Sequence, residues 1–142
     1  MTSADTRPAA YVGVGSNLAG PRQQVEQALQ ALQSIPSTSM VARSSLYRSA
    51  SFGPVEQPDF INAVVLLETG LDVAELFRSL QAIEDRQGRV RDERWGPRVI
   101  DLDLLVFADR IIATAELTVP HPGIAERNFV LLPLQEIAPD LI

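Results

Sequence analysis

The chain has 142 residues, of which 46% are hydrophobic and 21% charged, and its formal net charge is −6. These values predict one globular domain over residues 1–142, with residues 1–8 as a flexible tail. The chain has no cysteine, one histidine and no lysine among its 12 basic residues. This excludes disulfides, multi-histidine metal sites, Schiff-base chemistry and a Walker A loop. The acidic balance disfavours nucleic acid as a partner, and without a signal peptide or membrane span we expect a cytoplasmic protein.

The spacing of apolar residues predicts the elements in chain order. A short strand, Tyr11–Val14, leads through a turn-rich loop, Gly15–Pro21, into a helix that begins at Pro21 and ends before Pro36. Next come a β-like stretch over Met40–Ser49, a loop over Ser49–Pro58 and a strand over Phe60–Leu67. A second helix follows from Asp72, where Glu75 completes a capping box, to near Gly88. The last elements are a strand over Val99–Phe107, a hairpin at Ile111–Ile112 and a helix over Asn128–Ala138, which Pro133 kinks or restarts. This β-α-β-β-α-β order predicts an α+β, ferredoxin-like fold: an antiparallel sheet with two helices on one face, plus a C-terminal hairpin and short helix.

Two aspartates interrupt the last long apolar strand. Because side chains alternate along a strand, Asp101 and Asp103 share a face, with Cα atoms roughly 6.5–7 Å apart. The apolar neighbours are expected to point the other way, into the core: Ile100, Leu102, Leu104 and Val106. Two like charges in such a strand need a strong partner, and Mg²⁺, which takes a few carboxylates together with phosphate oxygens and water, suits them better than arginine. The competing interpretation is that both aspartates face solvent at a strand end, paired with arginines.

A charged loop leads into this strand. Within ten residues it carries four arginines: Arg89, Arg91, Arg94 and Arg98. The planar guanidinium suits phosphate oxygens and stabilises charge during phosphoryl transfer. Trp95, the only tryptophan, could stack on a flat ring or cover the site. A solvated loop with local acidic partners is the alternative.

Other polar and aromatic residues allow two interpretations each. Asn62 could form hydrogen bonds with the edge of a heterocycle or with the main chain of a loop, because a buried amide needs partners. Phe60 and Phe129 could pack in the core or hold a flat ligand between them. His121 could bind phosphate or be an ordinary loop residue. Gln81 and Glu84 share a helix face, which a solvated surface would also explain.

Four segments taken together, "GSNL", "FGPVEQPDFINAV", "RWGPRVIDLDLL" and "LTVPHPGIAERNFVLLPL", resemble the 6-hydroxymethyl-7,8-dihydropterin pyrophosphokinases (HPPK) of folate biosynthesis. The resemblance extends from Tyr11 to Leu141. It implies transfer of pyrophosphate from ATP, the co-substrate, to the pterin hydroxymethyl group, giving AMP and the pterin diphosphate. It also implies two Mg²⁺ ions, no partner beyond these small molecules, and a monomer.

The resemblance assigns roles residue by residue. It makes Asp101 and Asp103 the metal ligands and Arg89 and Arg98 the catalytic arginines. The ATP-binding residues that it implies are Gln81, Glu84, Arg91, Thr118, His121 and Arg127. The pterin-binding residues that it implies are Ser49, Phe52, Phe60, Asn62, Trp95 and Phe129.

Two other functions compete with this one. A two-metal nucleotidyl transferase would also place carboxylates on a ferredoxin-like sheet, but the acidic net charge argues against nucleic acid. A non-catalytic module that binds a small regulator would leave the arginine loop and the paired aspartates unexplained.

Overall fold

The computed structural model describes residues 7–17, 20–50, 59–88, 99–114, 117–122 and 128–139. In chain order the elements are β1 (Ala9–Ser16), α1 (Pro21–Gln33), β2 (Thr38–Arg43), β3 (Tyr47–Ser49), β4 (Phe60–Thr69), α2 (Val73–Arg86), β5 (Asp101–Phe107), β6 (Ile112–Ala113), β7 (Thr118–Val119) and α3 (Asn128–Ile137). The expected order of strands and helices is confirmed. Arg7 and Pro8, assigned above to the tail, are tied to the fold, because Arg7 Nη1 donates to Ser37 O at 2.7 Å and Pro8 O accepts from Thr69 N at 3.0 Å.

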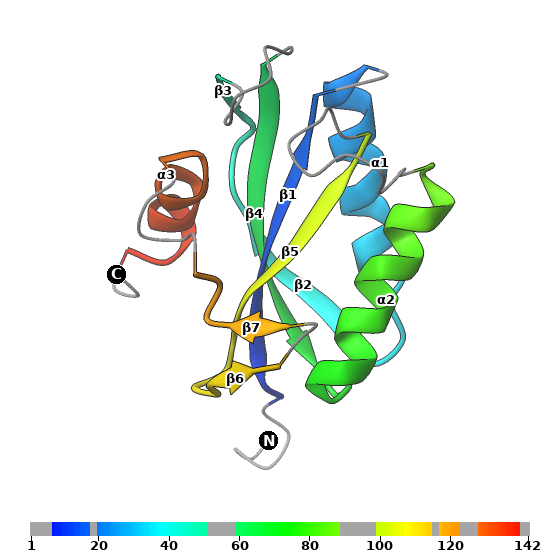
Figure 1. The fold of residues 1–142 in the computed structure, drawn as a ribbon, viewed down its shortest axis with the longest axis vertical. Helices are drawn as coiled ribbons and strands as arrows, with labels where there is room; N and C mark the ends of the chain where they lie inside the picture. Colours follow the sequence, from blue (N-terminus) through cyan, green and yellow to red (C-terminus); the bar gives the residue numbers. More distant parts are fainter. Residues whose placement is uncertain are drawn as a thin grey trace.

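The main sheet is antiparallel and has five strands in the order β2-β4-β1-β5, with β3 also paired to β4. Figure 1 shows β1 in the middle, between β4 and β5. The β-like stretch predicted over Met40–Ser49 is two strands, both on β4, separated by Ser44–Leu46. The hairpin that the sequence predicts between β5 and Ile111–Ile112 is wrong, because β6 pairs with β7 instead and forms a separate small sheet. The first strand is longer than predicted, since Gly15 and Ser16 continue the ladder with β4.

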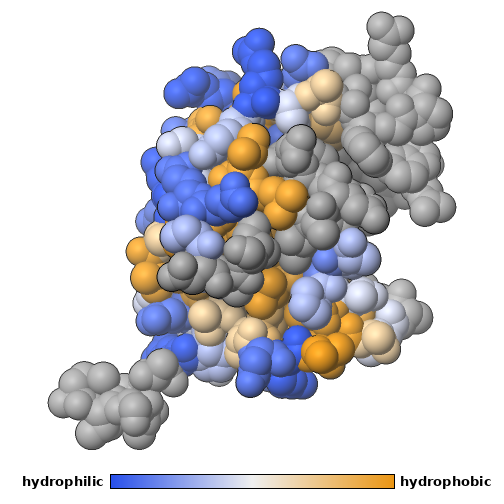
Figure 2. Space-filling view, turned by 90° about the vertical axis from the view of Figure 1, so that its left-hand side faces the viewer, coloured by the Kyte–Doolittle hydropathy of each residue, from blue (hydrophilic) through white to orange (hydrophobic). Residues whose placement is uncertain are grey.

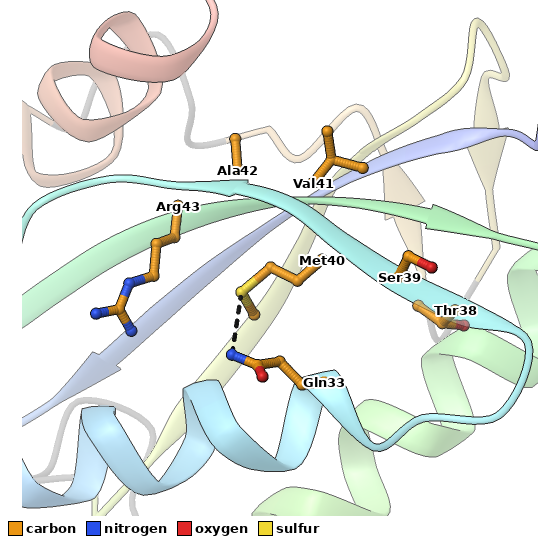
Figure 3. Close-up of a pocket in the computed structure, with 7 residues that line it drawn as sticks. All are labelled: Gln33, Thr38, Ser39, Met40, Val41, Ala42 and Arg43. Atoms are coloured by element: carbon orange, nitrogen blue, oxygen red, sulfur yellow. Dashed lines mark hydrogen bonds between the residues drawn. The ribbon is translucent and has the colours of Figure 1, made fainter.

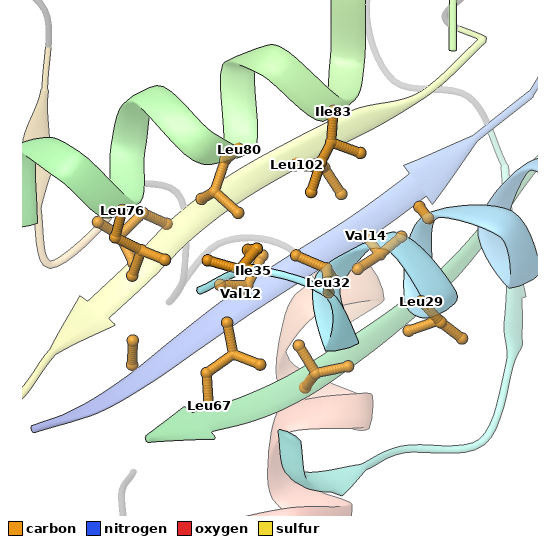
Figure 4. Packing of buried hydrophobic residues seen from close by; sticks show 14 of the residues in the cluster. Val12, Val14, Leu29, Leu32, Ile35, Leu67, Leu76, Leu80, Ile83 and Leu102 are labelled. Carbon is orange, nitrogen blue, oxygen red and sulfur yellow. The ribbon is translucent and has the colours of Figure 1, made fainter. Parts of the chain in front are cut away.

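Helices α1 and α2 cover one face of the sheet, as expected (Figure 1). The apolar stripe of α1 is Val25, Ala28, Leu29 and Leu32, and that of α2 is Leu76, Leu80 and Ile83. These side chains are buried against Val12, Val14, Leu67 and Leu102 from the strands (Figure 4). The predicted capping box is present: Asp72 Oδ1 accepts from Glu75 N at 2.8 Å, and Glu75 Oε1 accepts from Asp72 N at 3.1 Å. Burial of this face supplies the main apolar core.

The third helix lies on the opposite face of the sheet (Figure 1). From α3, Val130, Leu134 and Ala138 form a second buried cluster with Val64 of β4 and Leu105 of β5. Pro133 lies inside α3 and does not divide it. The position of this helix was not predicted from its residue pattern, and the helix leaves only part of the second face open.

One side chain of β5, that of Val106, lies on the other face of the sheet from the one predicted. Val106, expected beside Leu102 and Leu104, packs with the α3 cluster instead. The register of β5 on β1 shifts between Tyr11, opposite Val106, and Val12, opposite Leu104. Leu105 is therefore the extra residue of a bulge, and the alternation of side chains breaks there.

Candidate functional site

Asp101 and Asp103 lie on the α3 side of the sheet. Both are half-buried, and Leu105, two residues further along the same face, belongs to the α3 cluster. Leu102 and Leu104 point into the core on the other side. The prediction that the two carboxylates share a face and leave the core is confirmed. Both residues have interactions within the chain.

Two glycines of β1 form the floor beside these carboxylates. Gly13 is opposite Asp103 and Gly15 is opposite Asp101 in the ladder between β1 and β5. On its other side, β1 places Gly13 opposite Val64 and Gly15 opposite Asn62 of β4. Because neither glycine carries a side chain, the Leu105 and Asn62 side chains can approach the β1 backbone closely at Gly13 and Gly15. Sequence reasoning missed this role, although a Gly-x-Gly pattern inside an apolar run is a signal for it.

Asn62 is held above this floor. Its side chain is buried, and Nδ2 donates to Ser49 Oγ at 2.7 Å. A Cβ atom added to Gly15 would lie 2.8 Å from Asn62 Oδ1 and 3.8 Å from Phe60 Cδ1. The structure thus brings together Asn62, Ser49 and Phe60, three residues that the resemblance assigns to the pterin. Tyr47, opposite Asn62 in the register of β3 on β4, completes a row across four strands: Tyr47, Asn62, Gly15 and Asp101.

Glu84 supports the aspartate strand from the core side. It is buried at 3% exposure, and its Oε2 accepts the Leu102 N–H at 2.7 Å. Leu102 lies between the two aspartates on β5, which is an edge strand of the sheet within the described part of the chain, and Glu84 rather than another strand accepts this N–H. The interpretation of Glu84 as part of a solvated face is therefore wrong. Gln81, one turn earlier on α2, is half-buried.

His121 and Thr118 lie along the outer edge of β5. The His121 main-chain N–H donates to Leu105 O at 2.8 Å, which fixes this segment beside the strand. The His121 side chain is half-buried and Thr118 is exposed. Two residues that the resemblance assigns to ATP thus lie on the same edge as the aspartates.

The other assigned residues lie outside the described part of the structure: Phe52, Arg89, Arg91, Trp95, Arg98 and Arg127. Phe129 is the second residue of α3, but its side chain is not described. The assignments of these residues stay predictions.

A cluster that sequence reasoning missed joins α3 to β3. The Glu136 carboxylate accepts from the Ser45 N–H at 3.0 and 3.1 Å, from Ser45 Oγ at 3.0 Å and from Tyr47 Oη at 2.7 Å. The hydrogen bond from Tyr47, followed by that from the Ser45 main chain, lowers the pKa of Glu136 from its ordinary 4.5. The same bond to Glu136 raises the pKa of Tyr47 above 10.0. We call Glu136, Ser45 and Tyr47 the Glu136 cluster.

The surfaces around these groups differ in character. Figure 2 looks onto the side that carries α3, where hydrophobic groups interrupt the hydrophilic surface. A shallow pocket at the far edge of the sheet is lined by Gln33 and by residues of β2 (Figure 3). It contains none of the predicted site residues, and β2 and β5 are at opposite edges. The chemistry-bearing residues therefore gather around β1, β4 and β5, away from this pocket.

Comparison with known proteins decides the family. The sequence model of the 7,8-dihydro-6-hydroxymethylpterin-pyrophosphokinase (HPPK) family matches residues 11–139. The chain belongs to the HPPK family. A Pseudomonas aeruginosa 2-amino-4-hydroxy-6-hydroxymethyldihydropteridine pyrophosphokinase is 51% identical over 131 residues, covering 92% of this chain and 81% of the relative. A Haemophilus influenzae protein of the same name is 47% identical over 133 residues, covering 94% and 83%.

Solved HPPK structures share the fold. A crystal structure of an HPPK-DHPS in complex with substrates has a TM-score of 0.69 and 14% sequence identity, covering 94% of this chain and 40% of that chain. A Plasmodium falciparum HPPK-DHPS with pteroate gives the same values. The chain thus spans less than half of these longer proteins. The ferredoxin-like α+β prediction and the family resemblance are both confirmed. In the described part of the chain, no helix combines the length and apolar character needed to cross a bilayer.

Proposed function

We propose that this HPPK chain transfers the pyrophosphoryl group of ATP to the hydroxymethyl group of 6-hydroxymethyl-7,8-dihydropterin, giving AMP and the pterin diphosphate. The observation that carries the proposal is one row of residues on the open sheet face. Asn62 and Asp101 lie on either side of Gly15 in this row. A flat heterocycle at Asn62 and phosphates at Asp101 would then meet above the glycine floor.

The pterin subsite is proposed around Asn62. An amide offers a donor and an acceptor to the edge of a heterocycle. Ser49 Oγ accepts one Nδ2 hydrogen, which fixes the orientation of the amide. Phe60, beside Gly15, would contact one face of the ring. Phe52, Trp95 and Phe129 complete the proposed subsite by resemblance alone.

The phosphate subsite is proposed at Asp101 and Asp103. Two carboxylates on one face of a rigid strand suit Mg²⁺, which binds few protein carboxylates and completes its shell with water and phosphate oxygens. Two bound Mg²⁺ ions would supply charge neutralisation at the phosphates.

Positioning and charge neutralisation supply most of the catalysis in such a transfer, and no covalent nucleophile is needed. We assign charge neutralisation to Arg89 and Arg98. The proposed ATP contacts are Gln81, Glu84, Arg91, Thr118, His121 and Arg127. In the structure Glu84 Oε2 is bonded to the Leu102 N–H, so a contact with ATP would involve the same carboxylate group. A monomeric state and a cytoplasmic location stay predictions from the sequence.

The experiment is a product assay with ATP, Mg²⁺ and 6-hydroxymethyl-7,8-dihydropterin. We expect AMP and a pterin diphosphate in equal amounts. Formation of ADP would point to transfer of a single phosphoryl group, and absence of both nucleotides would reject the proposed reaction.

A further inference from the structure

The Glu136 cluster has no part in the proposed reaction, yet it connects two elements that border the pterin subsite. Glu136 lies in the last turn of α3, and Tyr47 is the first residue of β3. The four hydrogen bonds of this cluster come from Ser45 and Tyr47, two residues apart in the chain, and converge on one carboxylate. A carboxylate can accept several such bonds at once, and bonds to a charged group are shorter and stronger than neutral ones.

The break between β2 and β3 explains why Ser45 can bond to α3. Ser44 N donates to Val64 O at 2.9 Å, while Val64 N donates to Ser44 Oγ, also at 2.9 Å. The Ser44 side chain thus takes the place of a ladder carbonyl. The chain leaves the regular ladder at this point, and the next N–H, that of Ser45, points away from β4 and donates to Glu136.

The other contacts of α3 with the sheet are apolar. Val130 and Leu134 pack against Val64 and Leu105. Apolar burial holds two surfaces together but is not directional, so it leaves a helix free to slide or rotate by small amounts. The directed bonds of Glu136 fix the position of α3 along the sheet. Since Phe129 is seven residues before Glu136, about two helical turns, its main chain is fixed by the same contact.

A short path leads from the cluster to Asn62. Tyr47 is directly opposite Asn62, and Ser49, two residues further on the same strand, accepts from Asn62 Nδ2 at 2.7 Å. With only three residues, β3 has no long ladder to hold its register. The bonds from Tyr47 and Ser45 therefore anchor the start of β3, two residues before Ser49, which orients the amide.

We propose that Glu136 is a positioning residue for the pterin: it fixes β3, and with it the Ser49–Asn62 pair, against α3. This inference rests on the proposed function for the identity of the ligand. It predicts that loss of the cluster weakens pterin binding and leaves the phosphate subsite unchanged, because Asp101 and Asp103 lie on β5, two strands away from β4.

The test compares Glu136→Gln with Glu68→Gln, a matched loss of charge at an exposed glutamate toward the other end of β4. We expect Glu136→Gln to raise the KM and calorimetric Kd for the pterin by roughly three- to tenfold, the effect of one or two lost hydrogen bonds. The KM for ATP and kcat should stay within about twofold. Glu68→Gln should change none of these values.

Tyr47→Phe, which removes one donor without changing the ring, should weaken pterin binding in the same way. The double variant should lose less than the two single losses combined, because both remove one contact. Unchanged pterin binding in a folded Glu136→Gln variant would overturn the inference. An equal loss for ATP and pterin would also overturn it, since that indicates general disruption.

The inference and the proposed function can fail separately. If the native chain forms AMP and Glu136→Gln binds the pterin normally, only the role of Glu136 is rejected. If the native chain binds the pterin without forming AMP, and Glu136→Gln weakens that binding, the reaction is rejected and the role of Glu136 is supported.

Discussion

Gly15 is the residue at which the glycine floor and the Asn62 amide meet. An alanine there would place Cβ 2.8 Å from Asn62 Oδ1, closer than van der Waals contact allows, so the amide must move. We expect Gly15→Ala to weaken pterin binding roughly tenfold, the effect of forcing an extra methyl into a packed site. Calorimetry with the pterin measures this change.

Gly13→Ala is the matched control on the same strand. Its Cβ would lie 3.6 Å from the Leu105 side chain, an ordinary contact. This variant should keep its pterin affinity and gain slightly in stability, because alanine lowers the entropy of the unfolded chain. Equal losses in both variants would mean that the Asn62 contact is not what excludes a side chain at Gly15.

Asp101 and Asp103 are expected to be essential for turnover but not for folding. Each of Asp101→Asn and Asp103→Asn removes a charge that would hold Mg²⁺ near the phosphates. We expect AMP formation to fall by more than about a hundredfold in each variant. Thermal unfolding should show a folded protein in both.

Asp109→Asn, in the exposed turn after β5, is the control and should keep full activity. Near-native activity in Asp101→Asn or Asp103→Asn would contradict the metal assignment.

At the scale of elements, Glu84 joins α2 to the edge of β5. Replacing it by methionine keeps a similar volume but leaves the Leu102 N–H without this acceptor. We expect Glu84→Met to lose about 1–3 kcal/mol of unfolding free energy, the usual cost of an unsatisfied buried donor. Glu84→Gln keeps an acceptor oxygen and should lose less. Urea unfolding distinguishes the two variants, and equal stability of Glu84→Met and the native chain would show that water or another group replaces the carboxylate.

The elements themselves were largely predictable, because local signals specify them. The Asp72–Glu75 capping box and the apolar stripes of both long helices need only their own sequence. The bulge at Leu105 was not predictable, since it depends on the register of β5 against β1. The same holds for Glu136 and Ser45, which are 91 residues apart in sequence and meet only in the folded chain.

At the scale of the whole molecule, the attachment of α3 depends on pH. The pKa of Glu136 is lowered from 4.5, so its contribution to stability is present above that value and is lost as the pH falls through the folded pKa. The pKa of Tyr47 is raised from 10.0, so its contribution is present below that value and is lost as the pH rises through the folded pKa. Both groups are at the surface, so the contribution should be modest.

The stability advantage of the native chain over Glu136→Gln/Tyr47→Phe should therefore be constant between these two values and shrink on both sides. Urea unfolding below, between and above them measures it. A constant difference across the whole range would mean that the cluster does not stabilise the fold through its charges.

The fold and the family were accessible from sequence because the motif segments extend over nearly the whole chain and the family model matches residues 11–139. The shape of the site was not accessible from sequence, because it depends on which residues of β4 and β5 lie opposite each residue of β1. Asp101 and Asp103 could be assigned to one face by alternation, but their distance from Asn62 follows only from the strand order.

That strand order sets the distance between the two proposed subsites. Asn62 and Asp101 are separated by the single strand β1, and neighbouring strands lie roughly 4.8 Å apart, so the two positions are about 10 Å apart across the sheet. Main-chain hydrogen bonds set this length, and no side-chain substitution can alter it. The span between the proposed ring subsite and the proposed phosphate subsite is therefore built into the backbone. Variation among side chains can change how tightly each end binds, while the length of substrate that bridges them stays the same.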